Sequence, residues 1–241
     1  MKPIIGLVAR TSTDEDKDKL ICMWEKTRLA VVKKGGFPFI ITPPQDVVYE
    51  DVKPKEAPLL TSEEIEYIKK QVDFCDAIIL PGGYKWFEFD GVVYDYALSK
   101  NMPILGICAG MQMMCRYDTD KTDVAEDTTV KNETELNHHQ REVKYVHKVS
   151  IYPGSKLYKI LGSNLIDVNS KHNYHVDHVR NMLISSYSED GLIESVEYPD
   201  KNFVIGVQWH PETMIDYDQY ANKLMDNFIE EAENYSRVKK M

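Results

Sequence analysis

The first 107 residues alternate between short apolar runs and longer amphipathic segments. Short runs rich in Ile, Leu and Val are typical of strands buried on both faces of a sheet. Such runs occupy residues 3–9, 37–41, 77–80 and 104–107. Apolar residues at helical spacing occupy residues 20–34, 61–72 and 87–99. This alternation predicts parallel strands joined by right-handed helical crossovers.

From residue 143 onward the pattern changes to short strands with turn residues between them. The expected strands are residues 143–151, 166–168, 182–187, 193–197 and 203–208. Short spacing of this kind predicts an antiparallel extension that ends in another central strand. A short helix begins after Ser155, and a terminal helix covers residues 213–235. The predicted fold class is α/β, with a mostly parallel central sheet flanked by helices and a small antiparallel extension.

Three polar segments interrupt this pattern. Residues 10–19 and 43–58 are polar or rich in proline, which predicts surface loops. Residues 118–137 are rich in Thr and Asp and almost free of apolar side chains, which predicts a long loop and a candidate lid. With no linker and no repeat of fixed period, the chain is expected to form one domain over residues 1–241.

Composition and charge exclude several classes of partner. The net charge is −10, and no basic stripe is present, which argues against nucleic acid and anionic membranes. The four cysteines form no CxxC pair, which favours a reducing compartment. No apolar run approaches the roughly 18 residues of a membrane helix. We therefore expect a soluble cytoplasmic protein.

Cys108 occupies a position typical of a catalytic nucleophile. It follows the fourth apolar run and precedes a stretch that resembles the start of a helix. A nucleophile at a sharp strand-to-helix corner needs small neighbours, which Gly106, Ala109 and Gly110 supply. The helix N-terminus would favour a thiolate. The alternative is a structural cysteine, because free Cys is among the most buried residue types.

His210 and Glu212 supply the base and the orienting group that a cysteine nucleophile requires. His210 follows the last apolar run, at the end of a strand where α/β sheets place their active sites. Residues two apart in an extended chain point the same way, so Glu212 can reach the imidazole. A carboxylate there selects the tautomer and stabilises the imidazolium. Alone, the pair could be a chance pairing in a loop; together with Cys108 it predicts a triad.

Gly82 and Gly83 end the third apolar run. By themselves they are typical of an ordinary strand-to-helix turn. In an acyl-transfer site, the backbone N–H of Gly83 and that of Ala109 would together stabilise a developing oxyanion. Glycine suits this position because a Cβ would crowd a tetrahedral intermediate.

The histidines outside the predicted triad raise the question of a metal site. The residues considered are His138, His139, His172, His175 and His178. Their spacing fits no closed tetrahedral arrangement. We therefore expect no metal.

Three motifs together resemble the class I (triad) glutamine amidotransferase superfamily. They are Pro81-Gly-Gly83, Gly106-Ile-Cys-Ala-Gly-Met-Gln112 and Gly206-Val-Gln-Trp-His-Pro-Glu212. Further segments are similar to the γ-glutamyl-γ-aminobutyrate hydrolase branch, which is peptidase C26-like; they are residues 137–140, 147–157, 168–172 and 190–194. The resemblance covers nearly the whole chain and implies the flavodoxin-like fold of that superfamily.

The resemblance also implies a reaction and a set of site residues. Cys108 would attack a γ-glutamyl carbonyl and form a glutamyl thioester, His210 would transfer protons, and water would release glutamate. Gln112 matches a position that contacts the bound glutamyl group. The segment lining the amino-acid end of the substrate matches Asn169, Ser170 and His172. No cofactor is implied, and the expected partner is a small γ-glutamyl compound.

This chain departs from the hydrolase branch on the leaving-group side. The branch usually has Arg after the cysteine, where this chain has Ala109. It usually has an acidic residue and Pro after the second glycine, where Tyr84-Lys85-Trp86 stands. An Arg-Asp pair before the nucleophile strand is missing, and His172-Asn173-Tyr174 replaces His-His-Gln. The amine that leaves is therefore not assumed to be γ-aminobutyrate.

Two other functions remain open at this point. The chain could be a glutaminase subunit that supplies ammonia to a separate synthetase partner, or a binding protein that retains the fold. The complete Cys108, His210 and Glu212 set argues against the second. The sequence leaves the oligomeric state open, a homo-oligomer included.

Overall fold

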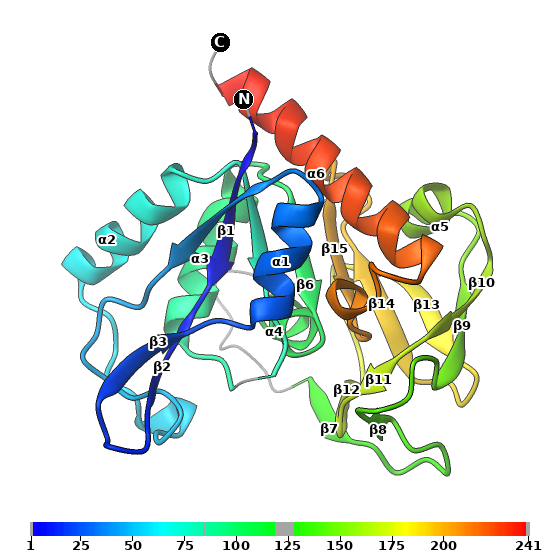
Figure 1. Cartoon of the computed structure of the whole chain (residues 1–241), viewed down its shortest axis with the longest axis horizontal. Helices are drawn as coiled ribbons and strands as arrows, with labels where there is room; N and C mark the ends of the chain where they lie inside the picture. Colours follow the sequence, from blue (N-terminus) through cyan, green and yellow to red (C-terminus); the bar gives the residue numbers. More distant parts are fainter. Residues whose placement is uncertain (1, 84, 119–127, 240–241) are drawn as a thin grey trace.

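The computed structural model describes residues 2–83, 85–118 and 128–239. A large mixed sheet runs through this part of the chain (Figure 1), and its eleven strands follow the main order β10-β9-β13-β14-β15-β6-β5-β1-β4, with β12 joining β14 to β7. The strands of this sheet are β1 (Ile4–Val8), β4 (Phe37–Ile41), β5 (Ala77–Leu80), β6 (Ile104–Ile107), β7 (Thr129–Lys131), β9 (His147–Ile151), β10 (Leu165–Val168), β12 (Tyr174–Val176), β13 (Leu183–Ser188), β14 (Ile193–Glu197) and β15 (Val204–Val207).

Two small ribbons and eight helical segments complete the described structure. The ribbons pair β2 (Arg10–Thr13) with β3 (Lys19–Cys22) and β8 (His139–Gln140) with β11 (Ser170–Lys171). The helices are α1 (Glu25–Lys33), α2 (Ser62–Asp73), α3 (Glu88–Ser99), α4 (Ala109–Tyr117), α5 (Lys156–Leu161) and α6 (Gln219–Lys239), with 3-10 turns η1 (Pro54–Glu56) and η2 (Pro211–Thr213).

The parallel half of the sheet places three loops at one edge. β15, β6 and β5 are parallel neighbours, in the register Gly206 to Gly106 and Leu105 to Ile79. All three strands are buried along their whole length, as expected for strands covered on both faces. Their carboxyl ends therefore lie side by side, and the loops that follow them can build one site.

Helices cover both faces of this sheet. On one face, α1, α5 and α6 pack their apolar side chains, such as Val31, Leu157 and Phe228, against the strands. On the other face, α2, α3 and α4 do the same. Figure 1 shows α1 and α6 on the near side, with α3 and α4 behind the strands. The predicted α/β fold class is thereby confirmed, including the antiparallel extension of β9, β10, β13 and β14.

The prediction for residues 10–34 was wrong in its first part. Residues 10–19 were expected to be a loop and residues 20–34 a helix, but the chain forms the ribbon β2–β3 before the shorter helix α1. The Asp14 carboxylate accepts hydrogen bonds from the amides of Asp16 and Asp18, and Lys17 has a positive φ of 67°. This tight turn reverses the chain, and period-3.6 reasoning does not detect it.

Smaller differences concern element ends. The strand expected over residues 143–151 begins at His147, and the terminal helix begins at Gln219, after the 3-10 turn η2. In the segment 118–137, residues 129–131 form β7, whereas residues 119–127 lie outside the described residues. The candidate lid therefore stays a prediction.

Among the residues described, none of the helices has the length and apolar content needed to span a membrane.

Candidate active site

Cys108 lies at a strained corner between β6 and α4. Its backbone has φ 51° and ψ −110°, a left-handed φ that is unusual for a residue with a side chain. The corner is closely packed: a Cβ on Gly110 would lie 2.0 Å from the Leu80 carbonyl oxygen, and one on Gly106 would lie 2.3 Å from Met114 Sδ. The neighbouring glycines are therefore required by space, as the sequence indicated.

His210 follows β15 and is held by hydrogen bonds on two sides. Its Nδ1 lies 2.8 Å from Glu212 Oε1. Asn169 fixes the backbone, because its Oδ1 accepts from the His210 amide at 2.8 Å and its Nδ2 donates to the His210 carbonyl at 3.1 Å. A ring whose Nδ1 is bonded to a carboxylate presents Nε2 to the rest of the site.

The charges around His210 favour its protonated form. Burial lowers the pKa of His210, but the Glu212 carboxylate and Cys108 outweigh burial and raise the pKa to about 10. The influence of Cys108 reflects its proximity to the ring. An imidazolium beside a cysteine is the arrangement that stabilises a thiolate.

Gly82, in the loop after β5, lies against the loops that carry Cys108 and His210. A Cβ on Gly82 would lie 2.8 Å from His210 Cε1 and 3.0 Å from Cys108 Cβ, so the three loops meet at this residue. The Gly82 carbonyl accepts from Trp24 Nε1 at 2.9 Å. Gly83 has φ 97°, and a Cβ there would lie 2.9 Å from the same Trp24 nitrogen. Trp24 thus fixes the conformation of this turn.

A cavity of about 370 Å³ opens beside Cys108 and His210. Gly83 and Glu212 also line it, whereas Ala109 lies next to Cys108 at the first position of α4. The structure therefore brings the predicted triad and one predicted oxyanion donor to a single cavity. Sequence analysis missed the remaining lining residues, which are Trp24, Glu25, Lys26, Arg141, Lys171 and Thr213.

Three of the missed residues, Lys26, Arg141 and Lys171, are cations, and the last two lie on neighbouring segments. Lys171 belongs to β11, and Arg141 directly follows β8, the partner of β11 in the same ribbon. Burial lowers the pKa of Lys171, and the Glu212 carboxylate opposes that shift. Basic residues close to the motif 137–140 and inside 168–172 were the signal that could have identified them.

The residues expected to bind substrate make their contacts within the protein. Gln112 Nε2 donates to the Tyr174 carbonyl at 2.8 Å and to Gln208 Oε1 at 3.1 Å. Asn169 holds the His210 loop and also donates to Thr213 Oγ1 at 2.8 Å. Neither is among the described residues that line the cavity. Their role in substrate binding stays a prediction.

Ser170 and His172 belong to a second buried group. Ser170 Oγ lies 3.2 Å from His138 Nδ1. The group also contains His147 and Glu194. Burial lowers the pKa of His172 to about 4 and raises that of Glu194 to about 7. Linear spacing gave no hint of this grouping, because two of its residues flank the separate β8–β11 ribbon and the other two lie on β9 and β14 of the large sheet.

A profile of the peptidase C26 family matches residues 88–212, which contain Cys108, His210 and Glu212. The chain belongs to the peptidase C26 family. This membership confirms the superfamily suggested by the three motifs. The assignment to the γ-glutamyl-γ-aminobutyrate hydrolase branch within it stays a prediction.

Curated relatives and solved structures agree with this family. The chain is 32% identical over 209 residues to the Schizosaccharomyces pombe protein named "Putative glutamine amidotransferase PB2B2.05", covering 83% of this chain and 78% of the relative. It is 27% identical over 188 residues to the CTP synthase of Thermotoga maritima, covering 65% of this chain and 36% of that enzyme. The glutaminase domain of Trypanosoma brucei CTPS, solved with bound acivicin, has the same fold, with a TM-score of 0.60, 16% identity and coverage of 98% and 94%. The peptidase C26 protein described here is thus an amidohydrolase of the glutamine amidotransferase type.

Proposed function

We propose that this C26-family protein hydrolyses the γ-glutamyl amide bond of a small γ-glutamyl compound through a thioester on Cys108. The observation that carries the proposal is the meeting of a strained elbow cysteine with a His210–Glu212 pair in one cavity. The raised pKa of His210 supports an imidazolium beside Cys108 at neutral pH, the partner that an activated cysteine requires.

In the first half of the reaction, the Cys108 thiolate attacks the γ-carbonyl carbon. The oxygen becomes an oxyanion, which the N–H groups of Gly83 and Ala109 stabilise. His210 Nε2 donates its proton to the amine as the C–N bond breaks. A glutamyl thioester remains on the enzyme.

In the second half, water enters the place vacated by the amine. His210, now neutral, takes a proton from this water while its oxygen attacks the thioester carbon. The C–S bond breaks, glutamate leaves, and the thiolate–imidazolium pair is restored. Throughout, Glu212 holds the ring through the 2.8 Å contact to Nδ1.

Lys171 and Arg141 give the cavity a cationic side suited to a carboxylate of the substrate. Both line the same cavity as Cys108. The glutamyl group carries an α-carboxylate, and charge-assisted hydrogen bonds to it would orient the γ-carbonyl toward the thiolate. We assign this contact to Lys171 first, because it is the more buried of the two.

A smaller cavity of about 140 Å³ shares Gly83 with the first one. Arg10, Tyr49 and Lys85 are among its lining residues. Lys85 is also where the sequence departs from the hydrolase branch. We propose that the amine leaving group extends past Gly83 toward this smaller cavity, so that Lys85 influences which amine is accepted.

The second candidate function is a glutaminase subunit that hands ammonia to a synthetase. The similarity to CTP synthases favours it, although the chain spans only 36% of the Thermotoga maritima enzyme. The two functions differ in how the protein treats glutamine. A hydrolase acts alone, whereas a glutaminase subunit depends on its partner.

The test is glutamate release by the purified protein from glutamine and from a panel of γ-glutamyl amines of increasing size. Wild type is compared with Cys108→Ala and with Cys22→Ser, a half-buried cysteine outside the cavity lining. We expect turnover of at least one γ-glutamyl amine by wild type and Cys22→Ser, with a glutamyl adduct on the Cys108 peptide by mass spectrometry. Release from glutamine alone, and only after a synthetase is added, would establish the second function instead.

A further inference from the structure

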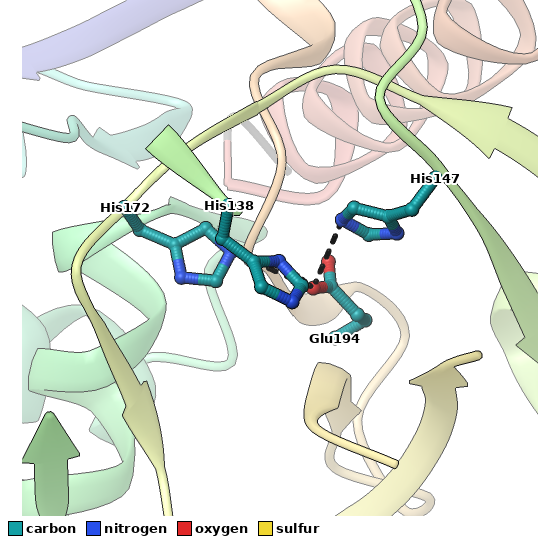
Figure 2. Close-up of side chains that lie close together, drawn as sticks. All are labelled: His138, His147, His172 and Glu194. Carbon is teal, nitrogen blue, oxygen red and sulfur yellow. Dashed lines mark ion pairs between the residues drawn. The ribbon is translucent and has the colours of Figure 1, made fainter. Parts of the chain in front are cut away.

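Four buried side chains converge behind the catalytic loops, and Figure 2 shows them pointing toward one another. We call them the His/Glu cluster: His138, His147, His172 and Glu194. His138 precedes β8, His147 begins β9, His172 follows β11, and Glu194 lies in β14. Their side chains are at most 2% exposed, and one ligand atom of each lies within 4.8 Å of all the others.

Most of the ligand atoms that face the centre of the cluster lack hydrogen bonds; the exception is His138 Nδ1, which lies 3.2 Å from Ser170 Oγ. From Glu194 Oε1 the distances are 3.5 Å to His147 Nε2, 3.6 Å to His172 Nε2 and 3.9 Å to His138 Nδ1. These distances are too long for hydrogen bonds. His147 Nε2, His172 Nε2 and both Glu194 oxygens are buried without a partner. Native proteins rarely leave such groups unsatisfied, because each costs about 1–3 kcal/mol or more.

The outer nitrogens show where the imidazole protons lie. His138 Nε2 is 2.9 Å from Asp190 Oδ2, His147 Nδ1 is 3.3 Å from the Lys148 carbonyl, and His172 Nδ1 is 3.0 Å from the Tyr174 carbonyl. Carbonyl and carboxylate oxygens only accept hydrogen bonds, so these contacts favour hydrogens on the outer nitrogens. At His172 Nδ1 the 3.0 Å contact to the Tyr174 carbonyl is shorter than the competing 3.4 Å contact from Asn132 Nδ2. In a ring that carries its single hydrogen at the outer nitrogen, the inner nitrogen presents a lone pair.

Three lone pairs and a carboxylate therefore face one another. Such an arrangement is repulsive unless a cation or a proton lies between them. We propose that the His/Glu cluster is a structural Zn²⁺ site that nothing in the sequence motifs assigns. Zn–N and Zn–O bonds of about 2.0–2.2 Å in a tetrahedron separate the ligand atoms by roughly 3.3–3.6 Å. The distances from Glu194 Oε1 to the three histidines, 3.5–3.9 Å, are close to this spacing, and the other ligand atoms, all within 4.8 Å of one another, would draw together around the ion.

The surroundings match a zinc ligand set. Histidine ligands of zinc usually donate their second N–H to a carboxylate or a carbonyl, which is what Asp190 and the two carbonyls accept here. Imidazole and carboxylate ligands suit Zn²⁺. The charges of Glu194 and Asp190 together balance a divalent cation. Four protein ligands without an open position indicate a structural role.

The site would stabilise the base of the active site. Asn169, next to Ser170 in the chain, holds both backbone groups of His210. The Glu194 carbonyl accepts from the Gln208 amide at 2.8 Å, two residues before His210. An ion in the cluster would tie the ribbon β8–β11 and the strands β9 and β14 together beneath that loop.

A contact from Ser170 suggests how the cluster would be arranged if it held no metal. The Ser170 hydroxyl lies 3.2 Å from His138 Nδ1 and can donate to it. Without a metal, this bond would satisfy His138, and a protonated Glu194 could satisfy one more nitrogen. One inner nitrogen would remain unsatisfied. The two forms differ in metal content, which can be measured directly.

The first experiment is metal analysis by mass spectrometry of protein purified without a metal-affinity tag from zinc-supplemented medium. Wild type is compared with Cys108→Ala, with the double variant His147→Ala/Glu194→Gln, and with His178→Ala, an exposed histidine outside the cluster. We expect about one zinc per chain in wild type, Cys108→Ala and His178→Ala, and at least about a tenfold lower content in the double variant. Cys108→Ala is included because Cys108 and His210 could themselves bind zinc, and the variant shows whether the metal is held there.

The second experiment uses wild type only, so it does not depend on the folding of a variant. The protein is stripped with a chelator and titrated with Co²⁺. We expect the visible absorption of tetrahedral cobalt, saturating at about one ion per chain. Absence of bound metal before and after addition of Zn²⁺ or Co²⁺ would overturn the proposal. So would equal metal content in the double variant, or loss of zinc in Cys108→Ala.

Discussion

The candidate active site and the His/Glu cluster use the same residue types with opposite consequences. At the active site, His210 and Glu212 are two residues apart in the chain, and Nδ1 of His210 lies 2.8 Å from Oε1 of Glu212. In the cluster, the histidines and Glu194 come from four separate segments, and each histidine nitrogen lies 3.5–3.9 Å from Glu194 Oε1. The first pair is within hydrogen-bond distance; the ligand atoms of the second group are spaced more widely, which is the basis of the proposed metal site.

The pKa values of the histidines differ between the two regions in the same way. The pKa of His210 is raised to about 10, because Glu212 and Cys108 outweigh the effect of burial. The pKa of His172 is lowered to about 4, because burial dominates and its inner nitrogen has no bonded carboxylate. His210, bonded to Glu212 and close to Cys108, thus holds a second proton, whereas burial favours the neutral form of His172, which can act as a metal ligand.

The largest expected effect comes from Cys108→Ala. Loss of the nucleophile should reduce kcat by more than about a thousandfold, since the remaining groups cannot form the thioester. The elbow tolerates a small side chain, so the Tm should stay within about 2 °C of wild type. Steady-state glutamate release and thermal unfolding measure the two. Activity above about a tenth of wild type would remove Cys108 from the mechanism.

Glu212→Gln removes the carboxylate charge that is bonded directly to the ring of His210. We expect kcat to fall by about a hundredfold or more, because the amide no longer stabilises the imidazolium. The His210 pKa is raised above its ordinary 6.5 to about 10, so its protonated form contributes stability below pH 6.5 that is lost as the pH rises through about 10. In the variant, this loss and the alkaline limb of the rate profile should move to lower pH.

A matched control for that experiment is Glu230→Gln, an exposed carboxylate on α6. Its kcat and its alkaline limb should equal those of wild type. An unchanged alkaline limb in Glu212→Gln would show that His210 owes its proton to another group.

Treatment with a chelator should affect the cluster through the thermal stability of the protein, measured as Tm, and not through the reaction at the active site. Removing zinc from wild type should lower the Tm by about 5 °C or more, because metal binding stabilises only the folded state. His178→Ala should behave like wild type, and Zn²⁺ should restore both. The double variant His147→Ala/Glu194→Gln should not respond to the chelator. A chelator response of equal size in that variant would place the metal elsewhere.

The smallest effect concerns the cationic side of the cavity. Lys171→Met should raise KM by about tenfold with little change in kcat, since it removes a contact made equally in the ground and transition states. Lys148→Met, which alters an exposed lysine paired with Asp167 on the neighbouring strand, is the control. A fall in kcat without a change in KM would assign Lys171 to the chemical step instead.

Much of the candidate site could be predicted because its parts are contiguous in sequence. The corner at Gly106–Gly110 and the His210–Glu212 pair each lie within a few residues, and parallel strands bring their ends to one edge by rule. The turn at Asp14–Asp18 was missed because its side-chain hydrogen bonds override the expected polar loop. The positions of Gln112 and Asn169 could not be read from motifs, because their partners, Tyr174 and His210, are far away in the chain.

The sequence by itself determined the alternation of strands and helices, the elbow at Cys108 and the proximity of Glu212 to His210, since local spacing and backbone geometry decide these features. Only the tertiary structure decided what lines the cavity and which histidines meet. Glu194 on β14 lies 56 residues from His138, which precedes β8 in a separate ribbon, and only the tertiary fold brings the two together. Long-range register has no local signature, because it depends on which strands share a sheet.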